Sequence, residues 1–457
     1  MQAIRADILL AGIEPEKELS GEMISAVTTD SRCIQPGCVF VAFPGARFDG
    51  HDFAAQAIAQ GAAYVVVNHD VPGVPAERLI YSPNSYRAML QIGRNYRAQF
   101  APQLVGITGS VGKTTTKEFT AAVLAAFGPT IKTAGNQNNE LGLPNTLLQL
   151  TADTAYGAVE MGMSHLGEIS RLSRCAQPAA GIITCIGVSH LETLGSRENI
   201  LRAKLEICDG LPQGAPLALN GDDPYLRGAV LPAHVRPVWY AIDDSRAEVT
   251  ACRIQQAADH TCFTIQDTAY GSFPVTIPAI GRHTVYDALA AYTAVTRLGL
   301  SAERAAAALS DFAQTGMRQH VVQASGVTVI EDCYNANPDS MRAALQMFRT
   351  YPCQRRFALL GDMLELGSIS DAAHAELGTL AAHSGLAGLV TYGDCAAGIA
   401  QAARAAGLMT RHVNSHGEAA AALVEWVRPG DAVLVKASRG MALEKALDIF
   451  YQTFPKV

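Results

Sequence analysis

Short apolar runs alternate with amphipathic runs along most of the chain, and this alternation predicts an α/β protein. Near the N-terminus, the β-branched runs at 38–42 and 64–67 predict two strands. The segment 52–60 between them has helical periodicity and stops at a glycine, which predicts a helix. We therefore expect residues 1–85 to form a first α/β unit.

The middle of the chain continues the alternation and contains one stretch with a period of two. Residues 246–278 alternate polar and apolar side chains and predict a small antiparallel β patch. We expect residues 86–313 to form a central unit built on a parallel sheet. The other predicted elements are strands at 156–159 and 181–188 and helices at 117–126, 196–208 and 284–298.

The last part of the chain, residues 314–457, alternates strand-like and helix-like runs most regularly. This order predicts a second doubly wound, mostly parallel sheet of the Rossmann-like type. The predicted strands are 327–330, 357–360, 389–392 and 432–435, and the predicted helices are 340–349, 371–383 and 417–427.

Composition narrows the class of protein. A chain of 457 residues is long enough for two to four domains, and the net charge of −7 gives no support for a nucleic-acid partner. No apolar run is long enough to cross a bilayer, and no signal peptide is visible. The ten cysteines are scattered and form no C-x-x-C pair, which favours free thiols in a reducing, cytoplasmic setting.

The stretch from Val105 to Thr116 predicts a phosphate-binding loop. A glycine-rich loop between a strand and a helix can turn its backbone N–H groups toward an anion. Lys113 is placed to reach the β- and γ-phosphates of a nucleotide, and Thr114 to bind Mg²⁺. The first glycine of the usual pattern is replaced by Ile107. The alternative is an ordinary glycine-rich βα turn, but such a turn would not need Gly-Lys-Thr at the helix start. The cradle consists of Thr108, Gly109, Ser110, Val111 and Gly112.

Other polar residues follow predicted strands of the same sheet. Glu160 ends one strand and is placed to hold Mg²⁺, directly or through water. His190 follows the next strand, and Lys204 lies 14 residues further on (204 − 190) in a predicted helix. Asn138 belongs to an asparagine-rich loop that suits hydrogen bonding to a polar substrate. A single histidine or lysine is usually structural. A functional role is favoured here because both residues lie on segments that begin at the ligand-binding edge of the sheet.

These motifs together resemble the Mur ligases, the ATP-dependent amide-bond-forming enzymes of peptidoglycan precursor synthesis, over nearly the whole chain. The segments at 332–341, 361–367 and 436–439 resemble the subgroup that adds D-alanyl-D-alanine. The Asp-Asn-Pro-Arg sequence expected in the enzymes that add the third residue is absent. The remaining motifs that carry the resemblance are Thr-Gly-x-x-Gly-Lys-Thr at 108–114, Asn-x-Asn-Asn-x-x-Gly-x-Pro at 136–144, Glu-Met-Gly at 160–162, His-Leu-Glu at 190–192 and Ala-Lys-Leu-Glu-Ile at 203–207.

The resemblance implies a reaction and a role in it for each of the three parts of the chain. The expected substrates are UDP-N-acetylmuramoyl-tripeptide, D-alanyl-D-alanine and ATP, joined through an acyl phosphate. Residues 1–85 would bind the UDP end, 86–313 would bind ATP, and 314–457 would close over the nucleotide. The sequence does not tell whether the tripeptide carries lysine or diaminopimelate. A monomer is expected.

The resemblance also implies roles for individual residues. Lys204 is expected to carry a carbamate, because a bare ammonium group beside two Mg²⁺ ions would be repelled whereas carbamate oxygens are suitable ligands. The expected catalytic residues are Lys113, His190, Lys204 and Arg318. The expected Mg²⁺ ligands are Thr114, Glu160, His190 and Lys204. ATP is expected to contact the 108–114 loop, His283 and Asp332, and the other substrates are expected to contact Ser31, Arg32, Asn138 and Asn335, with Arg47 and Asp49 as weaker candidates.

One departure from the family pattern concerns the nucleotide base. The family commonly has His-Asn-x-x-Asn there, and this chain keeps His283 but has Thr284 and Asp287 in place of the asparagines. Two other classes are considered. A folylpolyglutamate synthase-like ligase shares the central domain, but the N-terminal unit and the Tyr-Asn-Ala-Asn-Pro stretch argue against it. A non-catalytic nucleotide-binding protein would not need Glu160, His190 and Lys204 together.

Overall fold

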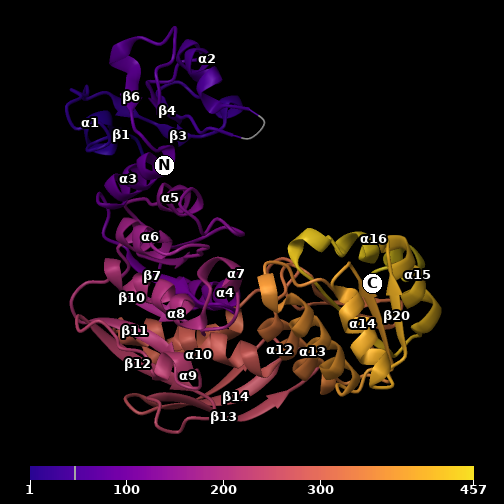
Figure 1. The fold of residues 1–457 in the computed structure, drawn as a ribbon. Coiled ribbons are helices and arrows are strands. Elements are labelled where there is room, and N and C mark those ends of the chain that lie inside the picture. The colour runs from indigo at the N-terminus through magenta and orange to yellow at the C-terminus, as the bar shows by residue number, and fades with distance from the viewer. Residues whose placement is uncertain (46–47) are drawn as a thin grey trace.

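The computed structural model describes residues 1–45 and 48–457, so Arg47, a weaker substrate-contact candidate, lies outside the described residues. It contains three parts, each with its own sheet (Figure 1). The N-terminal part lies at one end of the central part, and the C-terminal part lies beside the central part. The α/β class and the three-part architecture predicted from the sequence are confirmed. No helix of the described residues is long and apolar enough to span a membrane.

The N-terminal part is a four-stranded parallel sheet in the order β3-β4-β5-β6, with a two-stranded antiparallel pair, β1-β2, beside it. Strands β4 and β5 are buried along their whole length, as continuous β-branched runs predict for a parallel sheet covered on both faces. The elements are β1 (Ile4–Arg5), α1 (Ala6–Leu9), β2 (Met23–Ile24), β3 (Ala26–Thr28), β4 (Cys38–Val41), α2 (Ala54–Ala59), β5 (Tyr64–Val67), β6 (Leu79–Tyr81) and α3 (Ser85–Arg97).

Helix α3 connects the N-terminal part to the central part. Asn84 caps its first turn by accepting a hydrogen bond from the Arg87 N–H at 3.1 Å. Its buried face packs against α5 and α6 of the central part, and the Tyr96 hydroxyl donates a 2.8 Å hydrogen bond to the Leu150 carbonyl. One hydrophobic cluster therefore continues from the N-terminal part into the central part.

The central part is a nine-stranded sheet in the order β15-β14-β13-β12-β11-β10-β7-β9-β8. All neighbouring strands from β13 to β8 are parallel, whereas β14 is antiparallel to both of its neighbours, β13 and β15. The predicted antiparallel patch is therefore an extension of the parallel sheet. The strands are β7 (Gln103–Thr108), β8 (Thr130–Lys132), β9 (Tyr156–Glu160), β10 (Ala180–Ile183), β11 (Ala215–Asn220), β12 (Val235–Ala241), β13 (Val249–Gln256), β14 (Thr261–Asp267) and β15 (Gly271–Ile277).

Helices cover both faces of this sheet. In β7, Leu104 and Val105 belong to separate hydrophobic clusters, as the alternation of side chains across a strand requires. Helices α4 and α10 pack against each other on the Val105 face, where Phe119 stacks on Phe312 with ring centroids 3.9 Å apart. The helices are α4 (Lys113–Ala125), α5 (Gly142–Leu147), α6 (Glu168–Ala176), α7 (Leu191–Leu194), α8 (Arg197–Leu205), α9 (Pro224–Arg227), α10 (Arg282–Arg297) and α11 (Ala302–Ala308).

The C-terminal part is a six-stranded sheet in the order β16-β17-β21-β18-β19-β20, parallel except for β16. The predicted mostly parallel, doubly wound sheet is confirmed. The pattern did not predict β20, whose Thr-Arg-His-Val sequence is half-exposed and polar. The elements are β16 (His320–Ala324), β17 (Val327–Asp332), α12 (Pro338–Arg349), β18 (Arg356–Gly361), α13 (Ser370–Ala382), β19 (Gly388–Tyr392), α14 (Ala396–Ala405), β20 (Thr410–Val413), α15 (His416–Trp426), β21 (Ala432–Lys436) and α16 (Glu444–Thr453).

One predicted strand is shorter than expected. The apolar run at 181–188 predicts a single strand, but β10 ends at Ile183. The residues that follow leave the sheet because they bond to neighbouring loops: the Cys185 carbonyl accepts the Ser110 N–H at 2.9 Å, and the Ile186 N–H donates to Asp223 at 2.6 Å. This bend carries the chain past the phosphate loop to His190.

Candidate active site

The loop between β7 and α4 has the geometry of a phosphate cradle. Gly109 and Gly112 have φ angles of 148° and 85°, which side-chain-bearing residues rarely adopt. A Cβ at Gly109 would collide with the Thr184 hydroxyl, and one at Gly112 with the Asp287 carboxyl group. The Ser110 hydroxyl oxygen is buried and has no hydrogen-bond partner among the described residues. A tight glycine loop with an unpartnered hydroxyl at a helix N-terminus fits a bound phosphate group.

Lys113 is the first residue of α4 and lies at the edge of the cradle. Its ammonium group donates a 2.8 Å hydrogen bond to the Gly109 carbonyl. Burial lowers its pKa, and the positive charge of Arg318 lowers it further, whereas the Glu160 carboxylate raises it. Three charged groups from different elements therefore converge on the loop. A bound polyphosphate would restore a favourable partner for the two cations.

Glu160 is placed as an oxygen ligand at the end of β9. One carboxylate oxygen accepts the Thr114 hydroxyl at 2.7 Å, and the other accepts the Asn138 side-chain amide at 2.7 Å. Glu160 and Thr114 are both buried. A carboxylate, a hydroxyl and the adjoining phosphate cradle form the hard oxygen environment that Mg²⁺ requires, so the residues present fit this ion.

His190 and Lys204 lie on the same side of the cradle. His190 has a left-handed backbone, φ 64°, and burial together with the charges of Lys113 and Lys204 lowers its pKa to about 4. The imidazole is therefore neutral at pH 7, which is the form that binds metal ions. Lys204, on α8, is 2% exposed and has no hydrogen bond or ion pair with the residues that the structure describes. Burial, followed by the charge of Lys113, lowers the pKa of Lys204 well below its usual value.

The cavity extends from the cradle toward the start of α10. His283 lines this end together with Thr284 and Asp287, the two residues that replace the family's asparagines. Asp287 accepts the Thr116 hydroxyl at 2.9 Å, and burial raises its pKa to about 8. Burial also lowers the pKa of His283. Both side chains therefore favour their neutral forms at this end of the cavity.

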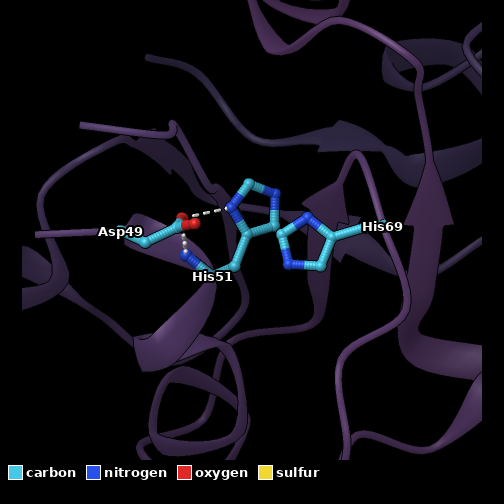
Figure 2. A group of neighbouring side chains, drawn as sticks. All are labelled: Asp49, His51 and His69. Carbon is cyan, nitrogen blue, oxygen red and sulfur yellow. Dashed lines mark hydrogen bonds and ion pairs between the residues drawn. The ribbon is translucent and has the colours of Figure 1, made fainter. Parts of the chain in front are cut away.

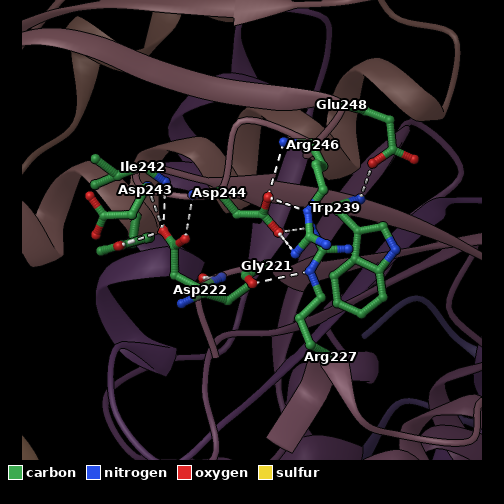
Figure 3. Close-up of polar contacts among 11 residues, drawn as sticks. Gly221, Asp222, Arg227, Trp239, Ile242, Asp243, Asp244, Arg246 and Glu248 are labelled. Atoms are coloured by element: carbon green, nitrogen blue, oxygen red, sulfur yellow. Dashed lines mark hydrogen bonds and ion pairs between the residues drawn. The ribbon is translucent and has the colours of Figure 1, made fainter. Parts of the chain in front are cut away.

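Tyr286 connects this end of the cavity to a polar network in the loops after β11 and β12. Figure 3 shows this network around Asp222 and Asp244. Its hydroxyl donates to Asp222 at 2.7 Å, and Asp222 also accepts the backbone N–H groups of residues 242–244. Nearby, Arg227 lies over the Trp239 ring at 4.2 Å and bonds to Asp244 at 2.5 Å. Four donors on one carboxylate lower the pKa of Asp222 and fix these loops.

The C-terminal part closes the other side of the cavity. Asp332, at the end of β17, accepts the Lys436 ammonium group at 2.8 Å, and the same group donates to the Asn335 carbonyl at 3.1 Å. The Arg318 guanidinium lies over the Tyr334 ring at 4.2 Å. All five of these residues line the cavity.

Most of the predicted site residues line one cavity of about 900 Å³. The Asn337 amide donates to the Ser189 hydroxyl at 2.6 Å, and Asp339 accepts the Val188 N–H at 3.1 Å, so the C-terminal part docks beside His190. The predicted residues that line the cavity are Ser110, Val111, Gly112, Lys113, Thr114, Asn138, Glu160, His190, His283, Arg318, Asp332 and Asn335. Thr108, Gly109 and Lys204 are buried and do not line the cavity.

The residues predicted to contact the UDP end do not line this cavity. Arg32 is exposed and pairs with Asp30 at 2.6 Å, and Ser31 lies in the same short turn. Asp49 accepts hydrogen bonds from the backbone and ring of His51, whose ring packs on His69 (Figure 2). Asp49 therefore bonds within its own loop, and any contact of Ser31, Arg32 or Asp49 with a substrate would be made in the N-terminal part.

Lys436, Glu365 and Tyr86 are among the cavity residues that the site predicted from the sequence does not include. Lys436 directly follows a predicted strand, and this position at a strand end could have marked it as a site residue. Glu365 lies in a recognised motif, but only the docking of two parts brings it near His190, 3.5 Å away. Tyr86, from α3, also lines the cavity, and nothing in the local sequence indicates this.

The chain matches three family models along its length. Residues 23–93 match "Mur ligase family, catalytic domain", 107–295 match "Mur ligase middle domain", and 317–439 match "Mur ligase, glutamate ligase domain". A curated relative, the UDP-N-acetylmuramoyl-tripeptide–D-alanyl-D-alanine ligase of Bacillus subtilis (strain 168), is 38% identical over 428 residues, covering 93% of this chain and 92% of the relative.

Two solved structures are similar over nearly their whole length. MurF from Acinetobacter baumannii has a TM-score of 0.90 at 30% identity and covers 99% of both chains. MurF ligase from Thermotoga maritima, solved with ADP, has a TM-score of 0.84 at 27% identity and covers 93% of this chain and 97% of that one. Family models, relatives and fold agree, and the chain belongs to the Mur ligase family, the ATP-dependent ligases.

Proposed function

We propose that this protein ligates D-alanyl-D-alanine to UDP-N-acetylmuramoyl-tripeptide and converts ATP to ADP and phosphate, as a step of peptidoglycan precursor synthesis. The observation that carries the proposal is the cavity of about 900 Å³ between the central and C-terminal parts. It joins a phosphate cradle and Glu160 of the central part to Asn335 and Lys436 of the C-terminal part. The names of the relatives at 35–38% identity support the choice of substrates.

The chain's residues suit acyl activation followed by amide formation. ATP supplies the γ-phosphoryl group, which activates the peptide carboxylate as an acyl phosphate that the acceptor amine then attacks. Lys113 and Arg318 offset the charge of the transferring group, which is where phosphoryl transfer needs stabilisation. The contacts of Asn337 and Asp339 hold the C-terminal part beside the phosphate loop, where closure of the parts over bound substrates would protect an acyl phosphate from hydrolysis.

We infer that Thr114, Glu160, His190 and Lys204 hold two Mg²⁺ ions. These ions would neutralise phosphate charge when bound. Lys204 fits this role only as a carbamate, which forms when its neutral amine adds CO₂ and releases a proton. A buried amine without a partner, with a pKa lowered by burial and by Lys113, favours the neutral form that this addition needs.

The remaining assignments concern domains and partners. The sheet of each part forms within one of the ranges 1–85, 86–313 and 314–457, which supports separate UDP-binding, ATP-binding and ligase roles. The family's small-molecule substrates and the net charge of −7 favour a protein without a nucleic-acid partner. We propose a cytoplasmic monomer, consistent with a supply of ATP and with free cysteines.

The test is acceptor-dependent phosphate release. Purified protein with ATP and Mg²⁺ is given UDP-muramoyl-dipeptides or UDP-muramoyl-tripeptides, each with D-alanyl-D-alanine, free lysine or free diaminopimelate. We expect release and product only with a tripeptide and the dipeptide acceptor, and the panel shows whether lysine or diaminopimelate is preferred. Robust ligation of a free amino acid to a UDP-muramoyl-dipeptide contradicts the proposal.

A further inference from the structure

A cluster of polar side chains lies in the C-terminal part, outside the cavity. Asp362, His374 and Cys395 each place one atom of a metal-ligating type within 4.8 Å of the others. His374 is fully buried, and none of these three residues lines the main cavity. Buried polar groups need hydrogen-bond partners, so the role of the cluster follows from what its members bind.

The hydrogen bonds of His374 engage both of its ring nitrogens. Its Nδ1 lies 2.7 Å from the Ser370 carbonyl, one turn earlier in α13, and its Nε2 accepts the Met363 N–H at 3.0 Å. A carbonyl only accepts and a backbone N–H only donates, so these contacts require the neutral ring with its proton on Nδ1. Asp362 in turn accepts the Ala396 N–H at 2.7 Å. The cluster therefore holds backbone groups in place and is not arranged as a metal site.

The backbone that His374 holds belongs to the loop of residues 361–367, between β18 and α13. Ser438 anchors the residues on either side of Met363: its N–H donates to the Asp362 carbonyl at 3.0 Å, and its hydroxyl accepts the Leu364 N–H at 2.9 Å. Met363 is 1% exposed. Without His374 its N–H would be buried and unpaired, which costs free energy comparable to a lost hydrogen bond.

Beyond these anchors the 361–367 loop reaches the central part. Glu365 has a left-handed backbone, φ 62°, and its carboxylate lies 3.5 Å from the His190 Nδ1. Gly367, φ 55°, packs against α7, because a Cβ there would lie 3.2 Å from the Glu192 side chain. A non-glycine residue keeps such a backbone only where its surroundings over-determine it. The anchors at residues 362–364 are the part of those surroundings that lies next to Glu365.

We propose that His374 is a positioning residue for the reaction. By accepting the Met363 N–H it keeps the 361–367 loop in the conformation that places Glu365 beside His190. His374 acts through the backbone of the loop and not by touching a substrate. Its kinetic consequence rests on the proposed function, because His190 belongs to the reaction centre proposed above.

Two substitutions separate the roles of the two ring nitrogens. In His374→Gln the side-chain amide reaches about as far as Nε2 and can accept the Met363 N–H. In His374→Asn the amide reaches only about as far as Nδ1 and can still donate to the Ser370 carbonyl. His383 is a matched control for both changes, because its Nδ1 also lies 2.7 Å from the carbonyl one turn earlier, that of Thr379, but the residue is exposed.

The full-length variants are compared by amide hydrogen exchange, by kcat and by the dissociation constant for ADP. In His374→Asn we expect faster exchange in the peptide that covers residues 361–367. Its kcat should fall at least about tenfold, since a misplacement of about 1 Å can cost on the order of a hundredfold. The affinity for ADP should not change, because none of the residues expected to hold the nucleotide lies in this loop. His374→Gln should stay within a few-fold of wild type, and the His383 variants should match wild type.

Ser438→Ala tests the neighbouring anchor without touching His374. It frees the Leu364 N–H, so we expect the same combination of faster loop exchange, lower kcat and unchanged affinity for ADP. This variant decides the question if His374→Asn does not fold.

Four results overturn the inference. The first two are a wild-type kcat in His374→Asn and loop exchange in that variant no faster than in wild type. The third is an equal loss of kcat in His374→Asn and His374→Gln, which would assign the effect to packing of the ring. The fourth is a loss of ADP affinity that matches the loss of kcat, which would mean general damage to the protein. Failure of the proposed function is distinct, because wild-type protein would then form no product with D-alanyl-D-alanine, while the exchange comparison would still show whether His374 holds the loop.

Discussion

The Thr116 hydroxyl of α4 donates a 2.9 Å hydrogen bond to the Asp287 carboxyl group of α10, directly beneath Gly112 of the phosphate loop. Asp287 is 6% exposed, and burial raises its pKa from 3.8 to about 8; the Thr116 hydrogen bond and the Arg318 charge act in the opposite direction. The family pattern has asparagine at this position. A carboxylic acid that stays protonated has the same shape as that amide and can both donate and accept.

Replacing Asp287 by asparagine should change how stability depends on pH. Between pH 4 and pH 8 the folded protein keeps a proton on Asp287 that the unfolded chain loses, so wild-type stability falls as the pH rises through this window. The asparagine side chain of the variant does not titrate. The melting temperature of Asp287→Asn minus that of wild type should therefore increase from pH 5 to pH 8. A difference that stays constant from pH 5 to pH 8 contradicts the raised pKa.

Lys113→Ala should abolish turnover without unfolding the protein. Lys113 donates to a loop carbonyl and faces the cavity, so it is not part of the hydrophobic core. Removing one cation from a phosphoryl-transfer site costs on the order of a hundredfold or more in kcat. The measurement is phosphate release together with a thermal melt, with Lys445→Ala at an exposed position as control. Near-normal turnover in Lys113→Ala means that the loop does not bind the reacting phosphate.

Glu160→Gln should raise the Mg²⁺ concentration needed for half-maximal activity. The glutamine can still accept the Thr114 hydroxyl, so the fold is kept while one negative charge is lost. The activity is titrated with Mg²⁺ at fixed ATP for wild type and variant. If the two Mg²⁺ titration curves superimpose, Glu160 is not a ligand of the metal site.

Lys204→Ala should be nearly inactive, and Lys204→Arg no better. Arginine keeps the positive charge but cannot form a carbamate, so it cannot supply the oxygen ligands that the site requires. Added acetate should partly restore activity to Lys204→Ala, because a small carboxylate fits the vacated space and replaces those oxygens. Full activity of Lys204→Arg, or a bare amine in a crystal with nucleotide and Mg²⁺, contradicts the carbamate.

The fold was predictable because its signals are local. Buried strands such as β5 appear as β-branched runs, and polar residues that end strands in an open sheet meet at one edge, which is why the sequence alone predicts Glu160 beside the phosphate loop. The proximity of Glu365 and His190 was not predictable, because it depends on how two separately folded sheets dock. The pairing of Lys436 with Asp332 depends instead on strand order within one sheet, because β17 and β21 are direct neighbours although the two residues are 104 positions apart. The roles given to these residues remain predictions.

Two hydrogen bonds from the C-terminal part reach Val188 and Ser189 of the central part, and the next residue is His190. If these two hydrogen bonds open, the strained backbone of His190 is free to relax, and the histidine leaves its position beside the phosphate loop. Completion of the reaction centre and closure of the molecule are thereby a single event. The undocked chain can still bind its nucleotide, but without an assembled reaction centre it does not hydrolyse it.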